Sequence, residues 1–264
     1  MKLCFSTLGC VNKSLDEIIS LANEFSAEGV EIRGIGGVVP NGEIKELSEE
    51  CAQATKDKLR ACGLSAVSLG TSCMFHTEEK YNAALKEGKE AILIAKRMGI
   101  PYIRVFGNNI TENRDECIER VGKGIAELCA FAEGTGVTVL LEVHGDFNTV
   151  EALSPILARL GECKTFGLIW DIYHSHKPYG DRWEEFYNVI KPYIRHVHIK
   201  DFSDKKEALV LPGKGDIPIV PIMKKLIADG YDGYFSLEWE RQWHPELDEL
   251  EVAMDHFVRL VREI

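Results

Sequence analysis

The sequence lacks the features that mark membrane proteins and nucleic-acid-binding proteins. It has no run of the ~20 apolar residues needed to span a bilayer, and Lys or Arg never occur in runs longer than two. Its formal net charge of −11 repels phosphate backbones and anionic headgroups. Polar residues follow Met1 too soon for a secretory signal. We therefore expect a cytoplasmic protein that binds neither nucleic acid nor membranes.

The chain also lacks a disulfide framework and a dinucleotide-binding loop. Its eight cysteines are scattered and include no CxxC pair, which fits a reducing compartment better than a secreted one. After the first apolar run, where a Rossmann domain carries GxGxxG, the chain reads Cys10-Val11-Asn12-Lys13. A Rossmann-type dinucleotide site is therefore not expected.

What the sequence does contain is a regular alternation of short apolar runs and longer amphipathic segments. The runs carry Val, Ile or aromatic residues, as is typical of buried strands. The eight predicted strands are Leu3–Thr7, Val30–Arg33, Ala66–Leu69, Tyr102–Phe106, Thr138–His144, Phe166–Asp171, Ile194–Lys200 and Tyr234–Trp239. The segments between them are predicted helices; Ser14 and Glu17, for example, form a capping box ahead of an apolar face.

This alternation predicts the fold. Strands separated by helices pair in parallel, and eight such units in 264 residues match the size of a TIM (β/α)₈ barrel. No linker or shift of composition divides the chain. We therefore predict an α/β fold in which residues 1–264 form a single (β/α)₈ TIM barrel domain.

Acidic residues and a histidine stand at the C-terminal ends of the last four predicted strands, whereas the first four end mostly in small or neutral residues. The four are Glu142, Asp171, His198 and Glu238. The chemistry of a TIM barrel lies at this end of its strands, so we expect these side chains to converge on one site.

Such a site needs a compensating positive charge. A carboxylate buried in an apolar strand costs several kcal/mol unless it is paired, protonated or bound to a cation, and three together repel one another. Three oxygen donors and one nitrogen suit a hard or borderline ion. We predict one divalent metal ion, with Mn²⁺ as the first choice and Mg²⁺ or Co²⁺ as alternatives.

At these motifs the chain resembles the xylose isomerase-like superfamily, the TIM barrels of sugar isomerases and epimerases. The resemblance extends over essentially the whole chain. Its most specific segments are LEVH at 141–144, WDIYH at 170–174, HVHIKD at 196–201, PGKGDI at 212–217 and LE at 237–238. The resemblance implies that Glu142, Asp171, His198 and Glu238 bind the metal and that His174 contacts the substrate.

The residues and the resemblance together indicate a metal-dependent isomerase or epimerase of carbohydrates. The metal would stabilise an enediolate formed from a ketose or a related polyol carbonyl, and Glu142 and Glu238 would act as acid and base. A base on each face of the substrate gives epimerisation, whereas one base moving a proton between two carbons gives isomerisation. The sequence leaves both outcomes open.

Three further residues are expected near the substrate. Lys200 either neutralises a substrate oxyanion or carboxylate, or forms a salt bridge with Asp201 or Glu238. His144 shares the strand face of Glu142 and is expected to hydrogen-bond around the metal site rather than to ligate. Arg241 follows the last strand and is expected to line the pocket.

Other functions stay open. A dehydratase of the inosose or dehydroshikimate type would use the same metal ligands to expel a β-hydroxyl. An AP endonuclease of this superfamily would need extra histidines after strands three and four, where the chain has Gly70-Thr71 and Gly107-Asn108. A non-catalytic sugar-binding barrel is a further alternative. Pairing into homo-oligomers is an expectation from the resemblance alone.

Overall fold

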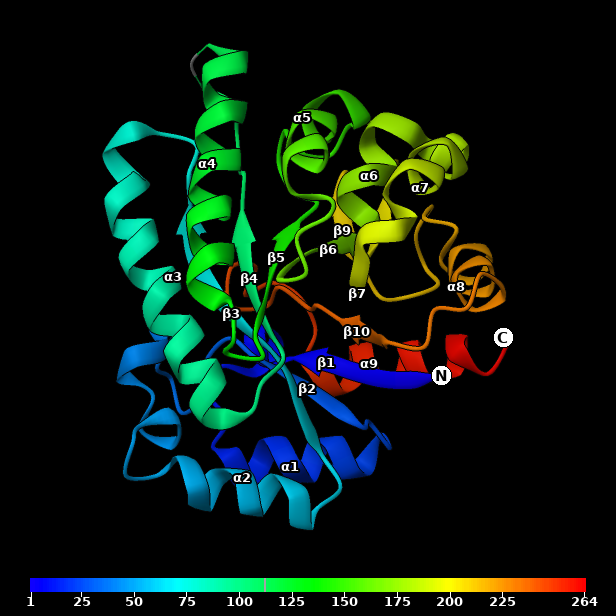
Figure 1. The fold of residues 1–264 in the computed structure, drawn as a ribbon. Coiled ribbons are helices and arrows are strands. Elements are labelled where there is room, and N and C mark those ends of the chain that lie inside the picture. Colours follow the sequence, from blue (N-terminus) through cyan, green and yellow to red (C-terminus); the bar gives the residue numbers. More distant parts are fainter. Residues whose placement is uncertain (112) are drawn as a thin grey trace.

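The computed structural model describes residues 1–111 and 113–264, and it forms a closed parallel barrel ringed by helices (Figure 1). The strands follow the order β1-β10-β7-β6-β5-β4-β3-β2, and each pairs in parallel with its neighbours. The barrel strands are β1 (Lys2–Ser6), β2 (Gly29–Ile32), β3 (Ser65–Met74), β4 (Tyr102–Phe106), β5 (Thr138–Glu142), β6 (Phe166–Asp171), β7 (Ile194–Ile199) and β10 (Tyr234–Leu237). The predicted TIM barrel fold is confirmed.

Helices connect consecutive barrel strands and cover the outside of the barrel (Figure 1). They are α1 (Leu15–Glu24), α2 (Ala52–Ala61), α3 (Glu78–Met98), α4 (Arg114–Ala132), α5 (Val150–Leu160), α6 (Ile172–Tyr179), α7 (Trp183–Ile190), α8 (Ile219–Ala228) and α9 (Leu250–Val261). Short 3₁₀ helices lie at Thr7–Cys10, Asn41–Glu43, Lys45–Leu47, Gly180–Arg182 and Lys191–Tyr193. Among the described residues, no helix is long and apolar enough to cross a membrane.

Local sequence explains where the helices begin and end. The backbone N–H of Ser14 donates to Glu17 Oε2 at 2.8 Å, while Ser14 Oγ accepts from the Glu17 N–H, which is the predicted capping box of α1. Helix α3 ends at Gly99, whose φ of 72° lies in the left-handed region that glycine adopts without steric cost.

The strand register points the four predicted metal ligands to one face. Asp171 and Ser236 both lie in register with His198, and Glu142 lies in register with Ile169. Asp171 is two residues beyond Ile169, and Glu238 is two residues beyond Ser236. Because side chains alternate between the two faces of a sheet, an offset of two keeps all four ligands inside the barrel.

A short antiparallel hairpin, β8 (Asp201–Ser203) and β9 (Ala208–Val210), follows β7 and was not predicted. The buried Asp201 anchors its base, since its Oδ2 accepts the N–H groups of Gly213 at 2.8 Å and Gly215 at 2.9 Å. A Cβ at position 215 would stand 2.2 Å from Asp201 Oδ1, so the segment PGKGD requires glycine there. The backbone N–H groups of this segment thus bind the carboxylate of Asp201.

Candidate metal centre

The four predicted ligands meet in the interior of the barrel. One ligand atom from each of Glu142, Asp171, His198 and Glu238 lies within 4.8 Å of the others, and all four residues are buried. They come from the ends of β5, β6 and β7 and from the residue after β10. We call these four residues the cage.

His198 presents one ring nitrogen to the cage. Its Nδ1 lies 3.3 Å from both Glu142 Oε1 and Glu238 Oε2, and its Nε2 lies 3.1 Å from Glu31 Oε2. Burial alone would lower the pKa of His198, but Glu238, Glu31 and Glu142 together raise that pKa well above its usual value. A metal ion among these carboxylates would take the place of the proton on Nδ1.

Lys200 supplies a positive charge beside the cage. Its Nζ lies 2.7 Å from Asp171 Oδ2 and 2.6 Å from Glu238 Oε2, and it also contacts Glu240. The side chain is 1% exposed. The structure therefore places Lys200 in ion pairs with Asp171, Glu238 and Glu240, whereas Asp201 is taken up by the hairpin.

Arg104, on β4, was not singled out from the sequence, yet it contacts two cage carboxylates. Its Nε lies 3.3 Å from Glu142 Oε2, and its Nη1 donates to Glu238 Oε1 at 2.6 Å. The available signal was a single cation inside the apolar strand Tyr102–Phe106, where an unpaired charge would be costly.

Negative charge still exceeds positive charge around the cage. The carboxylates in and beside the cage are Glu31, Glu142, Asp171, Glu238 and Glu240. Arg104 and Lys200 are, among the described residues, the Lys and Arg side chains that form ion pairs with these carboxylates. Burial raises the pKa of Asp171 to about 6; Lys200 opposes this shift, and Glu142 and Glu238 add to it. The buried oxygens Glu142 Oε2 and Asp171 Oδ2 face Arg104 Nε at 3.3 Å and Lys200 Nζ at 2.7 Å, respectively.

These observations fit a divalent cation. An ion bound by three carboxylates and one imidazole would balance the excess negative charge. The donor set suits Mn²⁺, Mg²⁺ or Co²⁺ and leaves coordination positions for oxygens of a substrate.

Two further histidines form one wall near the cage. The rings of His144 and His174 pack at an interplanar angle of 51° with centroids 4.1 Å apart, and His144 packs edge-on against Phe106 at 4.9 Å. Burial, with His144 and Lys200 nearby, lowers the pKa of His174 well below its usual value, so the ring is neutral. His144 Nδ1 and His174 Nε2 are buried without hydrogen-bond partners, which leaves both nitrogens available to a ligand.

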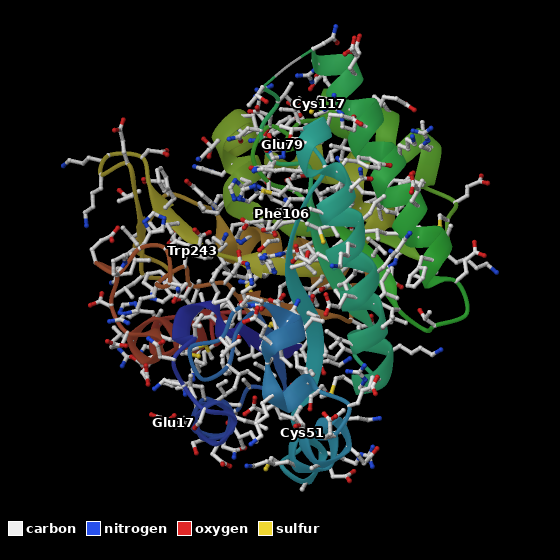
Figure 2. All side chains as sticks on the ribbon, turned by 90° about the vertical axis from the view of Figure 1, so that its left-hand side faces the viewer. Glu17, Cys51, Glu79, Phe106, Cys117 and Trp243 are labelled. Atoms are coloured by element: carbon white, nitrogen blue, oxygen red, sulfur yellow. The ribbon has the colours of Figure 1, made fainter. Side chains whose placement is uncertain are left out.

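Arg241 is not brought to the cage. Its Nη2 lies 2.5 Å from Glu249 and its Nε donates to the carbonyl of Leu247 at 3.2 Å. Trp243, on the same loop, is 55% exposed and is labelled to the left of Phe106 in Figure 2. Arg241 lines a smaller pocket of about 280 Å³ together with Cys10, Lys13 and Glu249, and none of the four cage residues lines that pocket.

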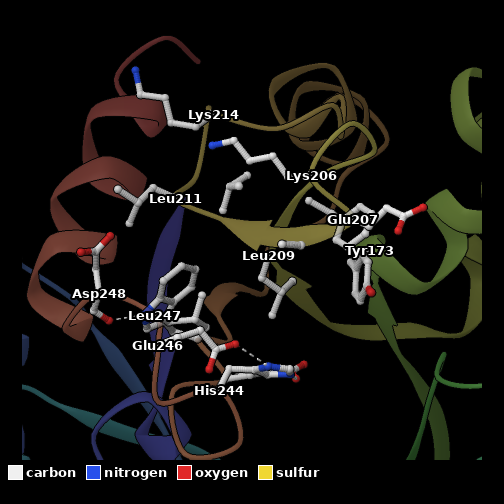
Figure 3. A pocket seen from close by; sticks show the side chains of 15 residues that line it. Tyr173, Lys206, Glu207, Leu209, Leu211, Lys214, His244, Glu246, Leu247 and Asp248 are labelled. Carbon is white, nitrogen blue, oxygen red and sulfur yellow. Dashed lines mark hydrogen bonds and ion pairs between the residues drawn. The ribbon is translucent and has the colours of Figure 1, made fainter.

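A cleft of about 550 Å³ opens beside the cage, between the β8–β9 hairpin and the loop after β10 (Figure 3). Tyr173, Leu209 and Leu247 form apolar walls. Glu240 lines the cleft and also contacts Lys200, so one ion pair separates the cleft from the cage.

Comparison with known proteins identifies the family. The model of the xylose isomerase-like TIM barrel family matches residues 19–260 of this chain. The chain belongs to that family. A fructoselysine 3-epimerase from Shigella flexneri is 24% identical in an alignment of 251 positions that covers 90% of each chain. An inosose dehydratase from Clostridium perfringens is 27% identical in an alignment of 158 positions that covers 52% of each chain.

Solved structures of the xylose isomerase-like family have the same fold. The IolI protein with a bound zinc atom superimposes with a TM-score of 0.80 at 22% identity, covering 100% of this chain and 97% of its own. A 3-keto-D-glucoside 4-epimerase from E. coli has a TM-score of 0.76 at 20% identity, covering 99% of both chains.

Proposed function

We propose that this protein is a metal-dependent sugar isomerase or epimerase that moves a proton on a carbon next to a carbonyl. The observation that carries the proposal is the pair Glu142 and Glu238, whose carboxylates both lie 3.3 Å from His198 Nδ1. Two carboxylates on one site can serve a substrate as a base and as an acid.

The chain's own residues would divide the reaction as follows. A divalent ion held by Glu142, Asp171, His198 and Glu238 would supply Lewis acidity at the oxygens of the substrate. One glutamate removes the proton from the carbon, and the electron pair of that C–H bond moves onto the carbonyl oxygen. For epimerisation, the other glutamate returns a proton to the opposite face of the same carbon. For isomerisation, the first glutamate returns it to the former carbonyl carbon, while a proton passes from the neighbouring hydroxyl oxygen to the former carbonyl oxygen. Lys200 would donate to a substrate oxygen once a metal ion takes its place beside Asp171 and Glu238.

The relatives support this class of reaction and the setting in which it occurs. Two of them carry epimerase names and act on sugar derivatives by those names, and the IolI structure carries a zinc atom. The donor set makes Mn²⁺ our first choice, with Mg²⁺ or Co²⁺ as alternatives. All eight cysteines are free thiols, five of them buried, which supports a reducing cytoplasm.

A dehydratase is the second candidate, because inosose dehydratases are among the relatives. Removal of the same proton would then be followed by loss of a β-hydroxyl, which needs a proton as it leaves. The buried nitrogens His144 Nδ1 and His174 Nε2 have no hydrogen-bond partner, and a neutral imidazole that carries its proton on such a nitrogen would donate it to the leaving oxygen.

The cleft of Figure 3 is proposed to hold the part of the substrate that does not react. Its volume of about 550 Å³ lies within the range of small-ligand pockets. Its apolar walls favour a substituent on the sugar over a free sugar.

A substrate panel tests the proposal. The Mn²⁺-loaded protein would be incubated in D₂O with ketoses, substituted ketoses, inososes and hydroxypyruvate, and the products followed by NMR. Deuterium at the carbon next to the carbonyl, with the hydroxyls retained, is the expected result. Formation of an enone would instead establish the dehydratase. No exchange into any compound of the panel would contradict both reactions.

A further inference from the structure

Glu31 contacts the cage residue His198 inside the barrel, at the ring nitrogen that faces away from Glu142 and Glu238. It lies on β2, while its partners lie on β7 and β10. The side chain is 5% exposed. A buried carboxylate that binds no substrate needs another reason to be in a barrel interior.

Both carboxylate oxygens of Glu31 are engaged. Oε2 lies 3.1 Å from His198 Nε2, and Oε1 lies 3.1 Å from His196 Nε2 and also accepts from Ser236 Oγ. His198 therefore lies between two sets of carboxylates, with Glu31 at Nε2 and the cage at Nδ1.

Once a metal ion takes the place of the proton on Nδ1, this placement decides which nitrogen of His198 keeps a proton. A neutral imidazole carries one proton, and a carboxylate at Nε2 holds that proton there as a hydrogen-bond donor. The lone pair is then on Nδ1, which faces Glu142 and Glu238. A carboxylate behind a ligating histidine also fixes the orientation of the ring.

We infer that Glu31 is a positioning residue that holds His198 as the Nε2–H tautomer with Nδ1 directed at the metal. The inference rests on the proposed function, because it concerns the same metal centre. It adds a residue that contacts neither the metal nor the substrate and that comes from the opposite side of the barrel.

A competing role for Glu31 is a second metal site. Cys4, Glu31 and His196 are buried together with candidate ligand atoms within 4.8 Å of one another. Against this role, both oxygens of Glu31 already have partners, and Cys4 Sγ lies 3.7 Å from the carbonyl of Phe5 as its donor. The experiment must therefore count metal ions as well as measure their affinity.

Calorimetric titration of the metal-stripped protein with Mn²⁺ tests the inference, using Glu31→Gln and the control Cys4→Ala. An amide has one acceptor oxygen and no charge, so the side chain of the E31Q variant cannot accept from both His198 and Ser236 and is a weaker acceptor for His198 Nε2–H. We expect one ion per wild-type chain, about 10- to 100-fold weaker binding by E31Q, and wild-type binding by C4A. The absorption spectrum of bound Co²⁺ should change in E31Q and not in C4A.

Equal affinity and equal Co²⁺ spectra for E31Q and the wild type would overturn the inference. Two ions in the wild type and one in C4A would overturn it in favour of the second site. Failure of the wild type to bind any ion would instead contradict the proposed function.

A measurement without substitution covers the case in which E31Q does not fold. In ¹⁵N spectra of the zinc-loaded wild type, His198 should carry its proton on Nε2, with Nδ1 shifted by the metal. Metal on Nε2 would overturn the inference.

Discussion

The two halves of the barrel contribute differently to the site. Strands β5, β6, β7 and β10 end in the cage, whereas β2 and β4 contribute Glu31 and Arg104, which contact the cage from its other sides. Arg33, after β2, has neutral partners instead, because its Nη2 donates to Ser72 Oγ at 2.8 Å and its Nη1 to the Val39 carbonyl. Burial, together with Arg104, lowers the pKa of Arg33 to about 10.

This difference separates ligation from charge balance. Under the proposed function, the second half would supply the atoms that bind the metal and move protons, and the first half would set the net charge and the orientation around them. Substitutions in the second half should therefore abolish the reaction, whereas substitutions in the first half should adjust affinity and stability.

The largest expected effect is that of metal removal. EDTA should eliminate turnover, and Mn²⁺ or Co²⁺ should restore it, because the cage binds the metal that stabilises the enediolate. Turnover would be followed before and after dialysis, with Ca²⁺ as a comparison ion. Full activity in EDTA would contradict the role of the second half as a metal site.

Glu238→Gln should have the next largest effect. Loss of one proton-transfer group should lower kcat by about a thousandfold, while circular dichroism stays that of the wild type. Glu240→Gln is the matched control, since Glu240 contacts Lys200 and lies outside the cage. If both variants lose activity equally, Glu238 has no special role in proton transfer.

Arg104→Met tests the first half. In the metal-free protein it leaves Glu142 and Glu238 without their guanidinium, so the free energy of unfolding should fall by about 3 kcal/mol. Mn²⁺ should bind more tightly than to the wild type, because a competing cation is gone. Denaturant unfolding with and without Mn²⁺ measures both effects.

Arg33→Met is the control for this variant, because Arg33 has no carboxylate within ion-pair distance among the described residues. It should lower stability by less and leave Mn²⁺ affinity unchanged. An equal response of the two arginine variants would remove the assigned role of Arg104.

The smallest effect is expected in the cleft. Leu209→Trp should fill part of it and raise KM about tenfold for substrates with a large substituent, with little change for small ketoses and none in Mn²⁺ affinity. Steady-state kinetics on matched substituted and unsubstituted sugars measure this. An equal rise of KM for both would place the substituent elsewhere.

The sequence predicted the barrel and the convergence of the four cage residues well, for a physical reason. Strand alternation fixes which residues face inward, and parallel pairing brings all carboxyl ends to one rim. Glu142, Asp171, His198 and Glu238 could thus be grouped without knowing any distance.

The remaining contacts depend on geometry across the barrel, which no local pattern encodes. Glu31 reaches His198 from 167 positions away, and Arg104 reaches Glu238 from 134; neither pair lies on neighbouring strands. Arg241 shows the converse, because its position just after Glu238 suggested the pocket, yet Glu249 and Leu247 hold it elsewhere. The hairpin was missed since its strands are three residues each.

The anchoring of the hairpin by Asp201 has a consequence for the thermodynamics of recognition. Four backbone N–H groups point at one carboxylate, from Phe202, Gly213, Gly215 and Ile217. One wall of the cleft is thereby ordered before any ligand arrives. If such a segment became ordered only on binding, the loss of its conformational entropy would make the free energy of binding less favourable. Here that entropy is lost during folding, so the wall should contribute its full contact energy to every substrate it admits.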